Sequence, residues 1–354
     1  MKKITKILHI TSVTTSKSNG VATAVSNYLN YEKNLANVAV FNLEDNVDFE
    51  GFSYNFSGYK SVSSLPDGFD SPDLVIFNEV YKPRYLRLYK ECIRRNIPYV
   101  IIPHGCLAKK AQNRKKLKKI FGNLLFFNRF IKKSLVVQYL NDNEFDNSIA
   151  KEHRYIISGN GISLKEKKNK YTNKDFVYIG RYDIDHKGLD LITGTVLDNR
   201  DWFINNGIKI YLYGPDLSDD YTKLEKIINE NGIFDIIILN GALYGNEKNR
   251  RLLNSYVFIQ TSRYEGQPMG IMEALSFGLP CIVTDGTSFK QYVNSNKCGI
   301  GIDFDKKHLF DAIKKIYDDD NFRDICSKNT VAIEMDYEWE KVIADCLKRY
   351  EALL

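Results

Sequence analysis

The chain of 354 residues lacks the features of a membrane-spanning, secreted or metal-binding protein. It has no run of the roughly 18 consecutive apolar residues that a membrane-spanning helix requires. At the amino terminus, Lys6, His9 and Thr11 interrupt the apolar region of about 7–15 residues that a secretory signal needs, so we expect a first β-strand there. The six cysteines contain no Cys-x-x-Cys pair and no metal-site spacing, which favours free thiols in a reducing compartment, the cytoplasm.

Other absences narrow the class of fold and enzyme. No Gly-x-Gly-x-x-Gly motif follows the first expected strand, which argues against a dinucleotide-dependent oxidoreductase. The sequence has no internal repeat and no low-complexity tract. Its composition, with 44% hydrophobic and 27% charged residues, is typical of a globular protein, and its length fits two domains of about 150–200 residues each.

Short β-branched or aromatic runs alternate with segments of helical period along the whole chain. This pattern predicts an α/β fold in which parallel sheets are covered by helices on both faces. We expect strands at residues 4–11, 37–43, 73–78, 98–102, 134–140, 176–179, 208–213, 234–239, 256–260, 280–284 and 299–302. Helices are expected between them, for example at residues 217–231 and 270–277.

A polar, lysine-rich stretch over residues 164–174 has no apolar period and divides the chain. We therefore predict two Rossmann-like, doubly wound domains, at residues 1–165 and 172–335, that face each other across a cleft where their strands end. A helix that is apolar on one face follows at residues 336–354. The sequence does not fix where this helix docks, and the first domain is one candidate.

The segment at residues 262–278 combines acids and glycines after a predicted strand. Its loop leads into a helix whose first N–H groups and positive dipole end suit a phosphate, and Gly266 and Gly270 would let the backbone approach a ligand closely. Glu265 and Glu273 stand eight residues apart, and such carboxylates can accept hydrogen bonds from the hydroxyls of a sugar or a ribose. The spacing alone fits equally well two acids that merely favour a helix start.

A second segment places two cations after another predicted strand. Arg181 and Lys187 flank a turn that begins at Gly180 and opens a helix. Fixed cations above a strand end can neutralise the charge that develops on a departing diphosphate. The alternative is a solvated basic pair on a loop.

Together these segments resemble glycosyltransferase family 4, whose members have the GT-B fold, over nearly the whole chain. The resemblance rests on Gly180-Arg181, Lys187-Gly188 with Asp190, Tyr213-Gly214-Pro215 and the Glu265-x7-Glu273 element. Three further matches are the histidine motif Pro103-His104-Gly105, the turn Asn160-Gly161-Ile162 and the first glycine loop at Asn19-Gly20. Many members have two adjacent glycines in that loop, so a side chain at Asn19 could reshape the acceptor side.

The resemblance implies roles for these residues. It implies catalytic roles for Arg181, Lys187, Glu265 and His104. It implies donor binding by Gly180, Arg181, Lys187, Glu265, Gly266, Gln267, Pro268, Met269, Gly270 and Glu273, with the two cations on the diphosphate, Glu273 on the ribose and Glu265 on the sugar. Gly20 and His104 are implied on the acceptor side. A neutral imidazole there could bond a sugar hydroxyl, and a purely structural histidine is the alternative.

The family mechanism is transfer with retention of configuration and without a covalent enzyme intermediate. The donor would be a nucleotide-diphosphate sugar, for which a UDP-sugar is the commonest choice in the family. Cations on the leaving group fit a reaction that requires no metal and no cofactor. Asp183 and Asp185 have the spacing of an Asp-x-Asp cation site, but they lie inside the turn where Lys187 already supplies positive charge.

Positive charge is concentrated in the first half of the chain. Residues 1–170 carry 28 Lys and Arg against 15 Asp and Glu, and the remainder carries 22 against 29. Ten of the basic residues and no acidic residue lie at residues 108–133, where apolar residues recur at helical spacing: Leu117, Ile120, Phe121, Leu124, Leu125, Phe127 and Ile131. A basic amphipathic helix favours an anionic membrane surface, which predicts a cytoplasmic protein that is peripheral on the inner face of the cell membrane. The alternative is that the apolar face packs into the core. A nucleic-acid partner is not expected, because no recognised binding module accompanies the basic run.

These inferences predict a glycosyltransferase of the hexosyltransferase class that acts on a glycan or lipid-linked glycan acceptor in bacterial capsular or exopolysaccharide synthesis. Two alternatives remain open from the sequence: a catalytically inactive accessory subunit, and a nucleotide-sugar epimerase on the same fold. Activity is favoured over the accessory role because Arg181, Lys187 and Glu265 are all present.

Overall fold

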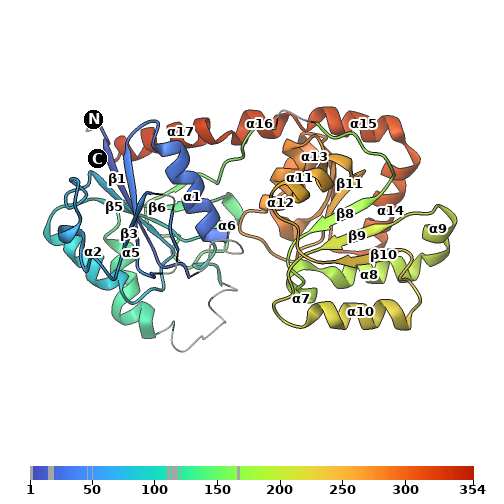
Figure 1. The fold of residues 1–354 in the computed structure, drawn as a ribbon, viewed down its shortest axis with the longest axis horizontal. Coiled ribbons are helices and arrows are strands. Elements are labelled where there is room, and N and C mark those ends of the chain that lie inside the picture. Colours follow the sequence, from blue (N-terminus) through green and yellow to red (C-terminus); the bar gives the residue numbers. More distant parts are fainter. Residues whose placement is uncertain are drawn as a thin grey trace. The chain divides into compact units, whose positions relative to one another are not determined.

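The computed structural model describes residues 3–14, 20–45, 47–49, 51–109, 112, 119, 121–165 and 168–354. The chain divides into two compact units: Met1–Gly161 with Trp339–Leu354, and Ile162–Glu338 (Figure 1). The boundary after Gly161 precedes the lysine-rich stretch that the sequence indicates. This stretch belongs to the second unit, because the Asn169 amide donates hydrogen bonds to the carbonyls of Leu252, Leu253 and Ser255 at 2.7–3.0 Å.

Among the described residues, the sheet of the first unit has seven parallel strands in the order β3-β2-β1-β4-β5-β6-β7. They are β1 (Lys6–Thr11), β2 (Asn37–Asn42), β3 (Ser53–Asn55), β4 (Leu74–Asn78), β5 (Tyr99–Ile102), β6 (Val136–Tyr139) and β7 (Tyr155–Ile157). The sequence predicts five of them and misses β3 and β7. These two edge strands have three residues each, which is too short for a periodic pattern to show.

Alternation along the strands sends side chains of the first unit into two cores. In β4, Val75 and Phe77 point to the core under helices α2 (Tyr85–Arg94) and α5 (Asn128–Lys132). Ile76 points to the other core, under α1 (Gly20–Glu32) and α17 (Trp339–Glu351). The carboxyl-terminal helix α17 therefore completes the first unit, where it lies along α1 (Figure 1). Trp339 of α17 is 1% exposed and packs edge-on against Tyr28 of α1, with ring centroids 5.3 Å apart.

Among the described residues, the sheet of the second unit has six parallel strands in the order β10-β9-β8-β11-β12-β13. They are β8 (Phe176–Ile179), β9 (Ile210–Tyr213), β10 (Ile237–Asn240), β11 (Val257–Gln260), β12 (Cys281–Thr284) and β13 (Gly299–Ile302). All six coincide with predicted strands to within a few residues. Both units are thus doubly wound α/β domains, which confirms the predicted fold class of each.

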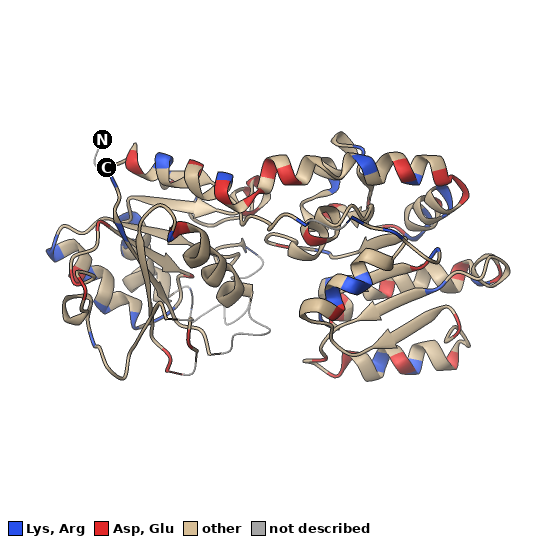
Figure 2. Ribbon diagram, turned by 45° about the horizontal axis from the view of Figure 1, so that its top comes forward, with Lys and Arg blue, Asp and Glu red and all other residues tan. Residues whose placement is uncertain are grey.

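Helices cover both faces of the second sheet. One core lies under α8 (Leu189–Asp198), α10 (Asp220–Glu230) and α14 (Lys306–Asp318). The other lies under α11 (Gly245–Asn254), α12 (Met269–Ser276), α13 (Lys290–Ser295) and α16 (Ala332–Tyr337). Outer faces such as that of α10 carry acidic and basic residues side by side (Figure 2). In the part of the chain that is described, no helix is long and apolar enough to cross a membrane.

The strand order reverses at one place in each sheet, between β1 and β4 in the first unit and between β8 and β11 in the second. Open α/β sheets bind ligands beyond the carboxyl ends of the strands at such a switch point. In the first unit Asn78 ends β4 at this point, and in the second unit Gly180 and Thr261 directly follow β8 and β11.

Candidate functional site

The two segments with candidate donor-binding residues meet at the switch point of the second unit. The first follows β8, where a Cβ added to Gly214 would lie 1.8 Å from the Gly180 carbonyl oxygen. Only glycine at position 214 therefore allows the loops after β8 and β9 to lie this close. The buried Tyr178 hydroxyl donates to the Arg181 carbonyl at 2.9 Å, and this hydrogen bond fixes the backbone of Arg181 to β8.

The turn that carries Lys187 is fixed to the end of β11. The short helix α7 (Ile184–Lys187) is capped by Asp183, whose carboxylate accepts from the His186 N–H at 2.9 Å. It ends at Gly188 with φ +63°, where a Cβ would lie 2.0 Å from the Thr261 carbonyl oxygen. The Thr261 hydroxyl donates to the carbonyls of Lys187 and Gly188 at 3.1 and 2.9 Å. The backbone of both segments is thus locked together.

Lys187 and Glu265 form the central ion pair of the site, with Nζ 2.5 Å from Oε1. Their side chains are only 15% and 11% exposed. The same carboxylate oxygen accepts from the Ser262 hydroxyl at 2.7 Å and the Gln260 amide at 2.9 Å. Burial alone would raise the pKa of Glu265, but the Lys187 ammonium and these hydrogen bonds outweigh it and hold that pKa below its usual range. Glu265 is therefore ionised, and its other oxygen accepts no hydrogen bond from a described residue.

A histidine that the sequence analysis missed orients Arg181. The Nε2 atom of His186 lies 2.7 Å from the Tyr264 carbonyl oxygen, which can only accept, so Nε2 carries the proton. Nδ1 then accepts from the Arg181 guanidinium at 2.5 Å. The imidazole stacks on the Tyr264 ring with centroids 4.0 Å apart. Burial, followed by the Lys187 charge, lowers the pKa of His186, so this neutral tautomer persists near pH 7. Its position inside the Arg181–Lys187 turn was the available sequence signal.

The second acid of the pair, Glu273, lies in α12 and forms a separate ion pair. Its Oε2 is 2.7 Å from Nζ of Lys248 in α11, with side chains 32% and 26% exposed. Lys248 was not among the predicted site residues. The Lys248 contact fixes the position of this carboxylate, which has no contact with the Lys187–Glu265 pair among the interactions described.

The loop before α12 uses its two glycines for different reasons. A Cβ added to Gly266 would meet nothing within 4 Å, so the space over this residue is open. A Cβ added to Gly270 would lie 3.3 Å from side-chain atoms of Gln260 and Phe258, so glycine there lets the helix pack closely on the sheet. The intervening residues Gln267, Pro268 and Met269 lead into the helix, whose first turn closes when Ile271 N–H donates to the Pro268 carbonyl at 3.0 Å.

The predicted acceptor-side residues lie in the first unit. His104 follows β5 in a left-handed conformation, with φ +49°, and its Nε2 lies 3.0 Å from the Asn78 amide oxygen. Burial, and then the neighbouring His9, lower the pKa of His104 to about 4, so the imidazole is neutral at pH 7. Gly20 begins α1, and a Cβ added there would meet nothing within 4 Å. Asn19 lies outside the described residues.

The predicted basic amphipathic stretch is only partly described, and Leu117 and Ile120 lie outside the described residues. Of the remaining apolar positions, Phe127 and Ile131 are buried in the core of the first unit, as the alternative interpretation requires. Phe121, Leu124 and Leu125 are 62%, 73% and 63% exposed. Leu124, Leu125 and the buried Phe127 all lie in one π-helical turn, Asn123–Phe127 (η2), whose pitch differs from the α-helical spacing that the sequence analysis assumed.

Among the described residues, the candidate site contains no cluster of metal ligands and no group of thiols. Within the described ranges, no group of three or more His, Cys, Asp or Glu side chains could hold a metal ion. Asp183 caps α7 and lies 3.3 Å from the Arg181 guanidinium, while the Asp185 side chain is 88% exposed. The six cysteines are free, and five of them are buried.

Comparison with known proteins points to one family. Residues 162–332 match the family model described as glycosyl transferases group 1. The GDP-mannose:cellobiosyl-diphosphopolyprenol alpha-mannosyltransferase of Xanthomonas oryzae is 21% identical over 308 residues, which are 84% of this chain and 79% of that protein. The lipopolysaccharide 1,6-galactosyltransferase of Salmonella typhimurium is 27% identical over 114 residues, which are 31% of this chain and 30% of that protein.

Solved structures share the fold at low sequence identity. Sucrose-phosphate synthase from Thermosynechococcus elongatus superimposes with a TM-score of 0.78 at 13% identity, over 99% of both chains. Anabaena HepE in complex with UDP and glucose superimposes with a TM-score of 0.73 at 12% identity, over 98% of this chain and all of that one. The likeness extends over both units of the chain.

Proposed function

Because the chain belongs to the group 1 glycosyltransferases and has the GT-B fold, we propose that it transfers a sugar from a nucleoside diphosphate donor to a glycan acceptor. The observation that carries this proposal is the constellation at the switch point of the second unit. Two cations, Arg181 and Lys187, and the ionised acid Glu265 stand together beyond the ends of β8 and β11. This combination suits a ligand that joins a diphosphate to a polyhydroxylated ring.

Each residue has a chemical role in this proposal. The cations neutralise the charge that develops on the departing diphosphate, and neither requires reorientation because each is already hydrogen-bonded. The unoccupied oxygen of Glu265 accepts from a sugar hydroxyl, and Glu273 accepts from the ribose. We propose that the acceptor attacks on the face from which the diphosphate leaves, with retention of configuration and without a metal, since the two cations supply the leaving-group charge stabilisation.

We propose a UDP-sugar as the donor and a lipid-linked glycan as the acceptor. UDP is bound in the HepE structure, which supports uracil as the base of the donor nucleotide. Guanine is the main alternative base, because the name of the Xanthomonas relatives includes GDP-mannose. That name also includes a diphosphopolyprenol, which supports a lipid-linked acceptor in the synthesis of a bacterial surface polysaccharide.

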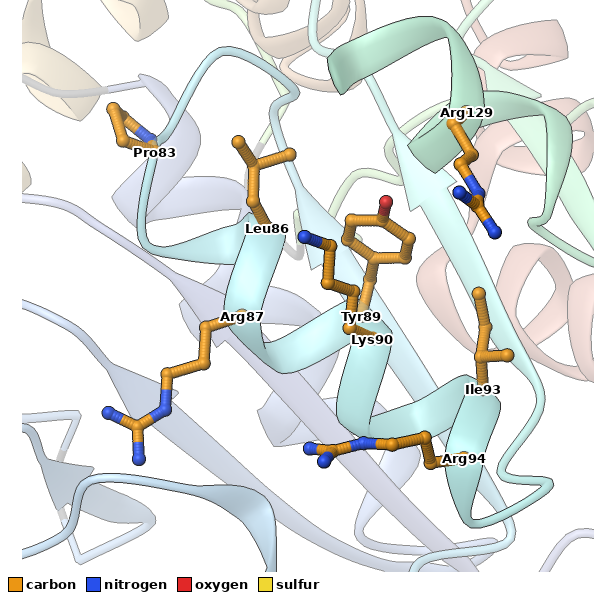
Figure 3. Close-up of a pocket in the computed structure, with 8 residues that line it drawn as sticks. All are labelled: Pro83, Leu86, Arg87, Tyr89, Lys90, Ile93, Arg94 and Arg129. Atoms are coloured by element: carbon orange, nitrogen blue, oxygen red, sulfur yellow. The ribbon is translucent and has the colours of Figure 1, made fainter. Parts of the chain in front are cut away.

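An anionic membrane surface is the proposed partner of the first unit, on the cytoplasmic side. A groove beside α2 is lined by Pro83, Leu86, Arg87, Tyr89, Lys90, Ile93, Arg94 and Arg129 (Figure 3). No acidic residue in the described ranges pairs with any of its four cations. Leu125 and Phe126 lie in the π-helical turn that leads directly into α5, the helix that carries Arg129, and both are exposed. Unpaired cations beside exposed apolar side chains fit anionic lipid headgroups over an acyl layer.

Thermal unfolding with a panel of nucleotides and nucleotide sugars, with and without EDTA, tests the donor site. A ligand at about 100 times its Kd stabilises the native state by about 2.7 kcal/mol. We expect one nucleoside diphosphate to raise Tm equally in EDTA, and the shift to be lost in Glu273→Ala but retained in Glu230→Ala, a control on the solvated face of α10. No shift with any nucleotide would favour the inactive accessory subunit. Consumption of the donor without an acceptor would favour the epimerase.

A further inference from the structure

Four polar side chains of the first unit form a continuous hydrogen-bonded chain that runs from His104 into the core. His104 Nε2 lies 3.0 Å from Asn78 Oδ1, and Asn78 Nδ2 lies 3.3 Å from His9 Nδ1. His9 Nε2 in turn lies 2.8 Å from Glu32 Oε2. His9 and Asn78 are fully buried and Glu32 is 2% exposed. A buried polar chain is stable only when each member is hydrogen-bonded, and here each one is.

Chemistry fixes the direction of every hydrogen bond in the chain. The Asn78 group that faces His9 also lies 3.4 Å from the Ile10 carbonyl oxygen, which can only accept. That group must therefore be the amide nitrogen, and the amide oxygen faces His104. It follows that His104 donates through Nε2 and that His9 accepts at Nδ1. The remaining proton of His9 is then on Nε2 and is donated to Glu32.

We propose that Glu32, acting through His9 and Asn78, holds His104 as the tautomer protonated at Nε2, so that its Nδ1 can only accept a hydrogen bond from a sugar hydroxyl. This inference rests on the proposed function, together with the acceptor-side role that the family resemblance implies for His104. Glu32, His9 and Asn78 are then positioning residues, because none of them needs to touch a substrate. An imidazole held this way selects a hydroxyl and rejects a phosphate oxygen, which has no proton to donate at neutral pH.

The other charged groups near His104 do not compete for its ring. The buried Glu144 accepts from the backbone N–H groups of Gly105 and Leu140 at 2.5 and 2.7 Å. Glu79 pairs with Lys82 at 2.8 Å. His9 is linked to His104 through Asn78, and its partner Glu32 lies at the far end of this series of hydrogen bonds. Substituting one of the side chains hydrogen-bonded in series with His104 is therefore the direct way to change its protonation.

Histidine tautomers can be measured without any substrate. The protein has five histidines, and two-bond proton–nitrogen correlations on protein labelled with ¹⁵N-histidine distinguish their tautomers. We expect His9 and His104 both to carry their proton on Nε2 at pH 7. A proton on Nδ1 of His104, or an imidazolium at His9, would overturn the proposal, because either requires the Asn78 amide to be reversed.

Two variants extend the test to the reaction. Asn78→Asp places a carboxylate against His104 and should raise the pKa of His104 by about 1 or more, moving the acid limb of the kcat/KM profile upward by the same amount. Glu32→Gln keeps an acceptor for the His9 Nε2 proton through its amide oxygen, so the Nε2 tautomers of His9 and His104 should both be retained. An unchanged His104 titration in a folded Asn78→Asp protein contradicts the proposal. If Asn78→Asp does not fold, the tautomers of Glu32→Gln and of the unmodified protein decide alone. The expected tautomers in a protein without transferase activity would refute the proposed function and the sugar contact, but the fixed tautomer of His104 would stand.

Discussion

The Lys187 ammonium lies 2.5 Å from the Glu265 carboxylate although the two residues are 78 positions apart in the sequence. They meet because the loops after β8 and β11 emerge side by side at the switch point of the second sheet. The pair keeps a carboxylate ionised in a site that is only slightly exposed, and it holds a cation ready beside it. One contact therefore serves both the stability of the site and its proposed chemistry.

Replacing Lys187 by Met should lower kcat by about 10²–10³, the usual effect of removing one preorganised charge from a transition state. Steady-state kinetics with the nucleotide sugar found in the thermal screen measures this. Lys226→Met is the control, since Lys226 pairs with Glu230 on the exposed face of α10. Near-normal turnover in Lys187→Met would remove Lys187 from the catalytic residues.

The same variant should change how stability depends on pH. The lowered pKa of Glu265 means that its stabilising contribution is complete above the unfolded value of about 4.3 and is lost as pH falls through the folded value. Without the ammonium, burial dominates and raises the folded pKa, so the ionised acid destabilises the variant near neutrality. The Tm difference between the two proteins should therefore shrink as pH falls from about 7 to about 4. Parallel Tm curves over this range would show that the pair is not energetically coupled.

The sequence was sufficient to predict most of the fold, because each long strand is a short apolar run flanked by turn residues. The strands that it missed, β3 and β7, have three residues each. The domain boundary was placed too late because lysine-rich composition resembles a linker, whereas Asn169 hydrogen-bonds the stretch to the second unit. The docking of α17 depends on the long-range fit of Trp339 against Gly161 and Tyr28, which no local pattern contains.

The candidate site was predictable where a motif is local and hidden where partners are distant. Arg181, Lys187, Glu265 and Glu273 were identified from short segments, and the structure brings the first three together. His186 was missed because a lone histidine in a turn has no periodic signal. Lys248 and the buried His9, Asn78 and Glu32 were missed because their roles come from contacts across the sheet rather than from neighbours in sequence.

His186→Phe should separate the orientation of Arg181 from the stability of the turn. Phenylalanine can still stack on Tyr264, but it offers no acceptor to the guanidinium. We expect Tm to change little and kcat/KM to fall by up to about 10²-fold, since a misplacement of about 1 Å can cost that much. His308→Phe, at an exposed position on α14, is the matched control. Equal activity in the two variants would show that Arg181 does not depend on His186.

Gly188 and Gly207 form a matched pair for testing how tightly the site is assembled. Their φ angles are +63° and +62°, so alanine at either position costs about 1–2 kcal/mol of backbone strain. At Gly207 the new Cβ meets nothing within 4 Å, whereas at Gly188 it lies 2.0 Å from the Thr261 carbonyl oxygen. Gly188→Ala should therefore lower the free energy of unfolding by a further 1–3 kcal/mol or so, measured by denaturant unfolding. If both variants lost the same free energy of unfolding, the backbone at Thr261 would move away from the new Cβ without a measurable energetic cost.

Reversing the charge of the groove in the first unit tests the membrane partner. Arg87, Lys90 and Arg94 lie on the exposed side of α2, and each basic residue near an anionic surface contributes about 1 kcal/mol, so a triple change to Glu should weaken binding by at least about 10²-fold. The measurement is co-sedimentation at low salt with vesicles of phosphatidylserine and phosphatidylcholine in equal amounts. The control changes Lys223, Lys226 and Lys315 of the second unit to Glu, which gives the same net charge.

If both triple variants lose vesicle binding equally, the attraction depends on net charge rather than on this groove. If neither loses it, the groove does not face the membrane. Binding that survives high salt would also contradict the electrostatic basis of the proposal.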